Sequence, residues 1–334
     1  MTIRIRDIAA KAGVSPTTVS NVIHGNNKKV SKETISKIEK LLNENHYIPS
    51  MGAHILAGNH SHLIGVLIGK KSEATHSIAE DPFTSVLLRT LEIEIFKHGY
   101  YMLFHMSDNP QDNWKLAATW DAEGLITIGL SAEENTEIRK LCNIPVVSID
   151  VYYPESNVAN IGLKDEEGGY MMASWLIDKG HQNFLFLSEY QIGSDYMRWQ
   201  GVTRALQENH LTISDSRHVI IPSTRNDRIR FYEKELSHFL ACGALFFASD
   251  YYAAEAVNYF HSQGIEIPEE LSVSGFDDNI YASMCFPKLT TIRQDIPAKG
   301  IAAVNKLFTL LSGEQGIQLE ERLPVSLIIR DSVR

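Results

Sequence analysis

The chain has 334 residues, enough for about two or three domains with buried cores, and its 44% hydrophobic and 22% charged residues are typical of globular proteins. This composition excludes a disordered, collagen-like or coiled-coil protein. The net charge is −10, no apolar stretch approaches the roughly 18 residues of a membrane span, and the first residues lack the apolar core of a signal peptide. The 3 cysteines stand apart and cannot form a closed set of disulfides, which favours a reducing, cytoplasmic setting.

The negative charge is unevenly distributed along the chain. Residues 1–62 carry 8 basic and 4 acidic side chains, a net charge of +4, so the remaining residues carry −14. A small basic segment ahead of a large acidic body indicates that the segment binds a polyanion while the body serves another purpose.

The basic segment has the pattern of short helices. Apolar residues recur at helical spacing over 5–12, and Gly13 stands where a left-handed residue ends a helix. A second helix is predicted over 15–23, because it begins with the Ser-Pro pair typical of helix starts. Ser31 is expected to cap a third helix with an apolar stripe over 35–42. The three helices would share one small core.

The spacing of Ala9, Gly13 and Val19 is that of a helix-turn-helix, in which a small residue permits a close helix crossing and a glycine supplies the turn. The second helix would then enter the major groove of DNA. Its outward side chains are short and polar, so they suit base edges and thymine methyl groups, while nearby lysines suit phosphates. The alternative is a helical hairpin used for protein contacts.

Residues 5–20, Ile-Arg-Asp-Ile-Ala-Ala-Lys-Ala-Gly-Val-Ser-Pro-Thr-Thr-Val-Ser, followed by Tyr-Ile-Pro at 47–49, resemble the DNA-binding head of the lac repressor (LacI/GalR) family of bacterial regulators. The resemblance runs the length of the chain and implies a body like a periplasmic binding protein. Many members carry arginine where this chain has Asn21, and asparagine pairs more naturally with adenine than with guanine. An operator of the usual family sequence is therefore not assumed. The predicted DNA contacts of the head are Arg6, Ser15, Thr17, Thr18, Ser20, Asn21, His24 and Lys29.

A hinge is predicted over 49–62. The stretch 50–59 is shorter than the roughly 12 residues at which an isolated helix becomes marginal, so we expect order there only on docking. The family resemblance implies that paired hinge helices of a dimer enter the minor groove, with Leu56 wedged into the central base step and Ala57 beside it. His54 replaces an arginine common in the family. The alternative is a flexible linker whose Leu56 packs on the body.

From residue 63 onward, short apolar runs alternate with amphipathic segments, which predicts an α/β body of parallel sheets covered by helices. The runs are too numerous for one open sheet, so two lobes are expected, divided near residue 160. The predicted domains are a helix-turn-helix head over 1–48, the hinge, and an effector-binding and dimerisation domain over 63–334. In that domain we assign about 63–160 plus 292–320 to lobe one and about 161–291 plus 321–334 to lobe two.

Aspartates stand where three of the apolar runs stop, at positions 150, 250 and 277. Ligands of such folds bind outside the carboxyl ends of the strands, which predicts a polar cleft between the lobes. For any one of these aspartates the alternative is a helix N-cap. The family resemblance places effector contacts, commonly to sugar hydroxyls, at Asp150, Arg198, Ser249, Asp250, Asp277 and Gln294, and Phe83 would add an apolar wall.

The sequence contains no catalytic constellation. It has no nucleophile elbow, dinucleotide fingerprint or phosphate-binding loop. Asp277 and Asp278 are adjacent, so their side chains diverge, and His60 and His62 lack further ligands at a structural-zinc spacing. We therefore expect no enzyme activity, cofactor or metal.

These patterns and the family resemblance predict a cytoplasmic transcriptional regulator, expected to be a repressor, that binds operator DNA as a homodimer. A small molecule between the lobes, expected to be a saccharide, would modulate operator affinity. The homodimer is expected because no heptad tail follows the last apolar run before Arg334. The alternative is a cytoplasmic sugar-binding or sugar-processing protein whose basic head serves another contact.

Overall fold

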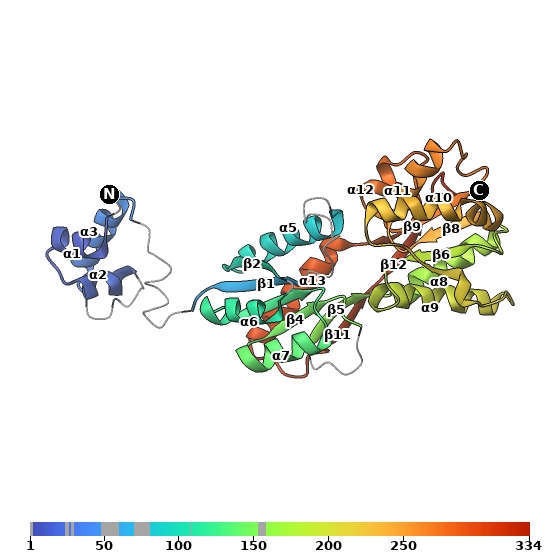
Figure 1. Cartoon of the computed structure of the whole chain (residues 1–334). Helices are drawn as coiled ribbons and strands as arrows, with labels where there is room; N and C mark the ends of the chain where they lie inside the picture. Colours follow the sequence, from blue (N-terminus) through green and yellow to red (C-terminus); the bar gives the residue numbers. More distant parts are fainter. Residues whose placement is uncertain are drawn as a thin grey trace. The chain divides into compact units, whose positions relative to one another are not determined.

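The computed structural model of the chain describes residues 3–23, 27, 30–47, 60–69, 81–107, 109–152 and 158–334. The chain forms two compact units, Met1–Ser61 and His62–Arg334 (Figure 1). Within the described ranges, no helix is both long enough and apolar enough to span a bilayer. Among the predicted DNA contacts, His24, Lys29, Leu56 and Ala57 lie outside the described residues.

The first unit contains α1 (Ile5–Ala12), α2 (Pro16–Ile23) and α3 (Lys32–Glu44). Gly13 ends α1 with a left-handed φ of 76°, and the Ser31 hydroxyl caps α3 by accepting from the Thr34 amide at 3.2 Å. These local signals stand where the sequence predicted them. The three helices close on a small core formed by Ile8, Ala9, Ala12, Val19, Val22 and Ile38.

The first lobe of the body is built on a sheet of six described strands in the order β11-β5-β4-β3-β1-β2. All five strand pairings in it are parallel. Helices α5 and α13 pack on one face and α6 and α7 on the other. The strands are β1 (Leu63–Gly69), β2 (Tyr101–Ser107), β3 (Gly124–Ile128), β4 (Val146–Ile149), β5 (Ala159–Leu163) and β11 (Glu320–Leu323). The helices are α5 (Pro82–Lys97), α6 (Pro110–Thr119), α7 (Ala132–Cys142) and α13 (Ile296–Leu311).

The second lobe has a sheet of six described strands in the order β12-β10-β9-β8-β6-β7, with β12 antiparallel to β10 and the other pairs parallel. Helices α8 and α9 cover one face, and α10 and α11 cover the other. The strands are β6 (Leu185–Ser188), β7 (His218–Ile220), β8 (Ala244–Phe247), β9 (Ser272–Asp277), β10 (Thr290–Gln294) and β12 (Val325–Ile328). The helices are α8 (Asp165–Asp178), α9 (Gly193–Glu208), α10 (Arg225–Cys242), α11 (Asp250–Ser262) and α12 (Ile280–Met284).

The strand pairings correct the predicted limits of the lobes. Strand β10 was assigned to lobe one from residue 292, but it pairs with β9 of the second sheet. Strand β11 was assigned to lobe two from residue 321, but it pairs with β5 of the first, and β5 itself runs to Leu163. Pro324 alone separates β11 from β12, and proline lacks the amide that would continue the ladder. The chain therefore crosses between the lobes after Leu163, after Gln294 and at Pro324.

Helices α8 and α9 approach so closely that glycine is required between them. A Cβ at Gly201 would overlap the carbonyl oxygen of Glu166 and the amide nitrogen of Tyr170. We expect Gly201→Ala to lower the free energy of unfolding by about 2 kcal/mol, because the backbones must separate. Chemical denaturation would measure this loss, with Gln207→Ala on the exposed side of α9 as a neutral control. Equal stability of the two variants would contradict the close packing.

Candidate functional site

The surface of α2 carries the side chains predicted to read DNA. Val19 and Val22 are buried against the neighbouring helices, so Thr17 is exposed and Ser20 and Asn21 are half-buried at the surface. The Ser15 hydroxyl lies 2.9 Å from that of Thr18 and accepts from the Thr18 amide at 3.1 Å, which begins the helix. The Arg6 side chain is exposed next to Asp7. This surface offers short hydrogen-bonding groups of the size that base edges accept.

Two of the basic side chains of this unit stabilise its fold. The Lys37 ammonium donates to the carbonyl oxygen of Ala12 at 2.9 Å, at the carboxyl end of α1. The Lys11 ammonium donates to the Asn45 side chain at 2.8 Å. A count of charges did not predict these roles, because the partners are distant in sequence.

Aspartates end one strand in each sheet with unusual backbone angles. Asp150 follows β4 with φ of 57°, and Asp277 ends β9 with φ of 115°. Residues with side chains rarely adopt these angles, and strained residues of this kind concentrate at functional sites. Both carboxylates stand at the carboxyl ends of parallel strands, where ligands of this fold class bind.

A chain of hydrogen bonds joins these two aspartates. The Lys299 ammonium of α13 donates to both carboxylate oxygens of Asp150, at 2.9 and 2.7 Å, and to the Gln294 amide oxygen at 3.0 Å. The Gln294 amide nitrogen donates to Asp277 at 2.6 Å, and the Ser249 hydroxyl donates to the other oxygen of Asp277 at 3.2 Å. The structure therefore brings four of the predicted effector contacts, from both lobes, into one network.

Arg198 of α9 is held rigidly beside this network. Its Nε donates to Asp165 at 2.8 Å, and one terminal nitrogen donates to the carbonyl oxygen of Ala248. The guanidinium lies over the Phe276 ring at 3.6 Å from its centroid, which fixes its plane. Burial lowers the pKa of Arg198, but the surrounding acidic groups, with Asp165 first, together raise it by more, so the group stays charged. A fixed guanidinium beside carboxylates suits a ligand with several neighbouring hydroxyl groups.

Two carboxyl groups near Arg198 titrate close to neutral pH. Burial raises the pKa of Asp277 to about 6, although Arg198 lowers it. Burial likewise raises the pKa of Asp195 to about 6, although Arg198 again opposes the shift. Desolvation also raises the pKa of Asp150, and the Lys299 ammonium counteracts part of that rise.

The raised pKa of Asp277 predicts a pH-dependent stability. A carboxyl with a higher pKa in the folded than in the unfolded chain contributes most below about pH 4, and the contribution is lost as the pH rises through about 6. From about pH 4.5 to 7.5 we expect the wild type to lose about 2 kcal/mol of unfolding free energy relative to Asp277→Asn. Urea denaturation across this range would measure the difference, and parallel curves would contradict it.

Asp250 is turned into the second lobe, so the structure gives no support to its predicted contact with an effector. The residue is fully buried at the start of α11. One carboxylate oxygen accepts from the Thr291 hydroxyl at 2.6 Å and the other from the Asn279 amide at 3.0 Å. Asp250 therefore joins β10 to the start of α12 inside the second lobe. Gly275 of β9 packs directly against its carboxylate. A residue at the end of a strand can face either the cleft or the interior.

A cavity of about 680 Å³ opens beside Asp277 and Gln294. Its walls come from α5 in the first lobe and from α12 and the start of α13, so it lies between the lobes. Phe83 lies close to this region in the first turn of α5, with its ring centroid 5.1 Å from the Lys299 ammonium. The lining residues are Pro82, Ser85, Val86, Asp277, Asp278, Asn279, Ile280, Tyr281, Gln294, Ile296 and Pro297.

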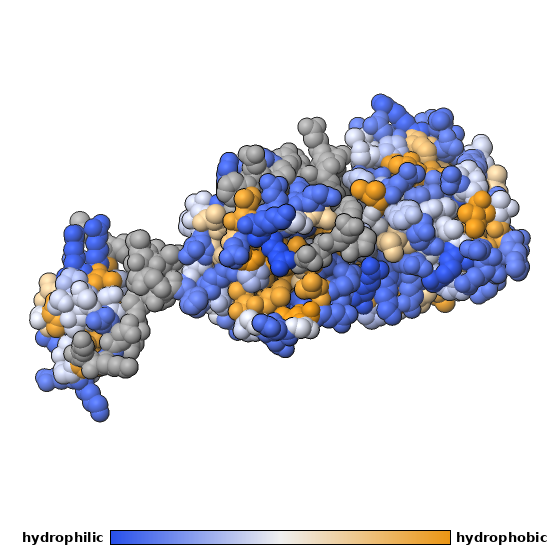
Figure 2. Space-filling view, turned by 90° about the horizontal axis from the view of Figure 1, so that it is seen from below, coloured by the Kyte–Doolittle hydropathy of each residue, from blue (hydrophilic) through white to orange (hydrophobic). Residues whose placement is uncertain are grey.

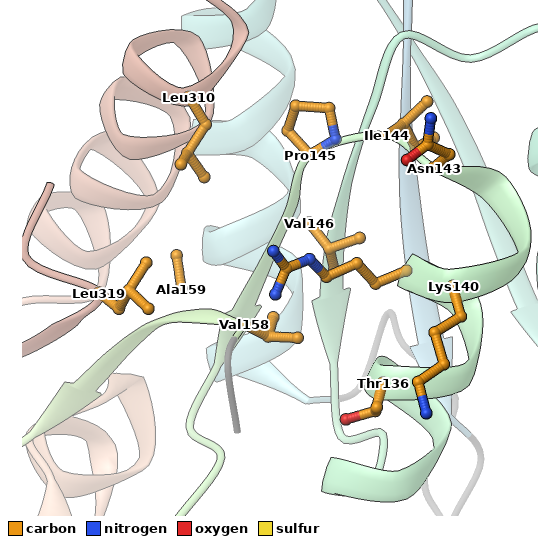
Figure 3. A pocket seen from close by; sticks show the side chains of 11 residues that line it. Thr136, Lys140, Asn143, Ile144, Pro145, Val146, Val158, Ala159, Leu310 and Leu319 are labelled. Carbon is orange, nitrogen blue, oxygen red and sulfur yellow. The ribbon is translucent and has the colours of Figure 1, made fainter. Parts of the chain in front are cut away.

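A second cavity, of about 620 Å³, lies at the opposite end of the first sheet (Figure 3). It adjoins Val146 and Ala159, the first residues of β4 and β5, whereas the cleft lies at the carboxyl ends of the strands. Lys140 and Thr136 of α7 border it on one side and Leu310 of α13 on the other (Figure 3). None of the predicted effector contacts lines this cavity.

Lys299 is the residue of the site that sequence reasoning missed. It is completely buried, on the side of α13 that also buries Ala303 and Leu307. The available signal was a lysine on the apolar face of an amphipathic helix, a position that charged side chains avoid unless they are paired. Its partner Asp150 is 149 residues away in sequence, so no local pattern predicted the pair.

A helix-turn-helix unit joined to a two-lobed body with a polar cleft defines the class of DNA-binding regulators that respond to a small molecule. Comparisons with known proteins agree with this class. The model of bacterial regulatory proteins of the lacI family matches residues 4–50, and that of the periplasmic binding protein-like domain matches residues 173–333.

The similar proteins match over nearly the full chain. The HTH-type transcriptional repressor PurR of Histophilus somni (strain 129Pt) is 30% identical, with 99% of this chain and 98% of PurR covered. The probable HTH-type transcriptional repressor ExuR of Bacillus subtilis (strain 168) is 27% identical, with the same coverage. A crystal structure of the lac repressor dimer bound to operator and the anti-inducer ONPF matches with a TM-score of 0.85 at 25% identity, covering 99% of each chain. The chain belongs to the lacI family of bacterial regulatory proteins, and it is a DNA-binding transcriptional regulator rather than an enzyme.

Proposed function

We propose that this regulator represses transcription as a homodimer on a two-fold symmetric operator, and that a small polyhydroxylated molecule, a saccharide, binds between its lobes and changes operator affinity. The observation that carries the proposal is the hydrogen-bond network from Asp150 to Asp277, with Arg198 fixed beside it. The protein would act in the cytoplasm, where bacterial operator DNA lies.

The composition of the cleft favours a neutral ligand rich in hydroxyl groups. Asp150 and Asp277 supply acceptors, and the Arg198 guanidinium supplies donors in a fixed plane. Asp165 and Asp195 add negative charge around Arg198, which opposes a strongly anionic ligand. The ring of Phe83 provides an apolar surface of the kind that packs against a sugar ring.

Exposed apolar side chains on both lobes support the homodimer. On the first lobe Phe96, Tyr101 and Met106 are 60%, 52% and 43% exposed, and the latter two belong to β2, an edge strand. On the second lobe Met284, the last residue of α12, and Phe286, just after it, are 77% and 84% exposed. Figure 2 shows hydrophobic residues gathered in patches on both lobes. Patches of this kind mark protein interfaces, and a second copy of the chain would cover them.

The lobes would couple the effector to DNA. An effector that contacts both lobes favours one relative pose, and this pose sets the spacing of the two hinges in a dimer. A coupling free energy of about 1 to 3 kcal/mol suffices, and operator must change effector affinity by the same factor. The hinge contacts are predicted for Leu56 and Ala57, and the contacts of the head for Arg6, Ser15, Thr17, Thr18, Ser20, Asn21, His24 and Lys29.

Selection of bound sequences from a random DNA pool tests this function directly. The purified full chain should enrich a two-fold symmetric site, and one member of a panel of mono- and disaccharides should change its affinity at least about 10-fold. Purine bases belong in the same panel as a competing class of effector. Failure to enrich any site would contradict the DNA function, whereas a response to a purine alone would contradict the saccharide.

A further inference from the structure

Lys299 is a buried cation in an unfavourable place. It lies in the first turn of α13, where the amide groups of the helix end already carry partial positive charge. Its side chain has no exposed surface. Burial of an ammonium group is costly even when it is paired, and an apolar side chain of similar volume is often as stable in such a position. Stability alone does not account for a lysine here.

The ammonium group is fully engaged by acceptors from two elements. Both oxygens of Asp150 and the amide oxygen of Gln294 lie within 3.0 Å of it, which matches its three N–H donors. The Phe83 ring lies on a further side. Lys299 therefore fixes the rotamers of Asp150 and Gln294 at the same time. The Asp150 side chain remains 25% exposed, so it can still contact a ligand while the buried Lys299 ammonium holds its carboxylate in place.

These contacts span one of the crossings between the lobes. Gln294 is the last residue of β10 in the second sheet, and Lys299 lies five residues later on a helix of the first lobe. The hydrogen bond from Lys299 to Gln294 closes a loop around the crossing over 294–296. Gln294 in turn donates to Asp277 of the second lobe. Within this chain of contacts the hydrogen bond from Lys299 to Gln294 is the one that joins the two lobes, so a change of angle at the crossing would stretch or break it.

We infer that Lys299 is a positioning residue, which orients Asp150 and Gln294 toward the cleft and braces the crossing over 294–296, so that its contacts set the relative pose of the two lobes. The inference rests on the proposed function in one respect: the pose matters because it determines operator affinity. A ligand that bonds Asp150 and Asp277 would act on both ends of this chain of contacts.

A double-mutant cycle on the full-length chain tests this role. The variants are Lys299→Met, Asp150→Asn and the two combined. Lys306→Met is the matched control, because Lys306 lies on the same helix and pairs with Glu321 at 3.1 Å near the surface. The measurements are the thermal midpoint, hydrogen exchange of the amides over 294–299, and affinity for the DNA site selected with the wild-type chain.

Asp150→Asn should lower the thermal midpoint by about 5 °C or more, because the ammonium stays buried without its counter-ion. The double variant should recover to within about 2 °C of the wild type, since the unpaired charge is gone. It should nonetheless exchange the crossing amides about 10-fold faster and change operator affinity at least about 5-fold. Lys306→Met should leave both the exchange of the crossing amides and the operator affinity unchanged.

Wild-type exchange and operator affinity in a stable double variant would overturn the inference and leave Lys299 a structural residue. Additive effects of the two single substitutions would overturn it as well, because the groups would then be independent. If the wild-type chain selects no DNA site, the proposed function fails, while hydrogen exchange at the crossing still decides the role of Lys299.

Discussion

Asp277→Asn is expected to weaken binding of the active saccharide by at least about 100-fold while the ligand-free protein still binds operator. The substitution keeps the shape of the side chain but removes the charge, and charge-assisted hydrogen bonds to hydroxyl groups contribute about 1.5 to 3 kcal/mol each. Asp277 uses one oxygen for Gln294 and the other for Ser249, and each oxygen retains a further acceptor site for a ligand. Titration of the protein–operator complex with the sugar that acts on the wild type would measure the loss.

The neighbouring Asp278 provides the control for this prediction. Its carboxylate pairs with Arg293 at 2.6 Å and with Arg330, so it ties the end of β9 to β10 and to the last residues of the chain. Asp278 also borders the cavity, but both of its carboxylate oxygens are bound by arginines, so Asp278→Asn should lower the thermal midpoint and leave the effector response intact. A normal response in Asp277→Asn, or equal loss in both variants, would show that Asp277 does not bind the effector.

Leu56→Ala is expected to weaken specific operator binding by about 100-fold, roughly 3 kcal/mol, and to leave nonspecific DNA binding nearly unchanged. The family resemblance places Leu56 as a wedge at the kinked central base step, which occurs only in the specific complex. Electrostatic contacts with phosphates dominate nonspecific binding, and leucine does not contribute to them. Affinities for the selected site and for calf-thymus DNA, each measured over a range of salt concentrations, would separate the specific from the nonspecific part of the binding free energy.

The salt dependence supplies the control for Leu56→Ala. For Leu56→Ala, the slope of log binding constant against log salt concentration should match that of the wild type on both DNAs, because no phosphate contact is removed. Equal loss of affinity for the two DNAs would mean that Leu56 stabilises the fold or the dimer instead of acting at the base step.

Local signals in the sequence predicted the head and the general architecture of the body. Gly13 ends a helix and Ser31 begins one where expected, because a left-handed residue and a capping hydroxyl act within one turn of the backbone. The alternation of apolar runs with amphipathic segments predicted parallel sheets covered by helices, because each apolar run must be buried and the amphipathic helices supply the cover. The resemblance of residues 5–20 to the lacI family then pointed to the class of function.

The lobe limits and the inner side of the cleft were decided only by tertiary structure. The short segments β10 and β11 carry no local pattern that assigns them to one sheet, and ladder pairing over long separations assigned β10 to the second sheet and β11 to the first. Asp250 and Asp277 both follow the pattern of a strand-end aspartate, but only Asp277 joins the network at the cleft.

The same distinction explains Lys299. In the sequence Lys299 is not distinguished from the other lysines of predicted helices. Its role depends on Asp150, which lies far away along the chain. The sequence by itself therefore determined the helices, the caps, the order of strands and helices, and the family. Tertiary structure alone decided which strands pair, which aspartate is buried and which lysine is paired, because those outcomes depend on contacts between residues that no local pattern connects.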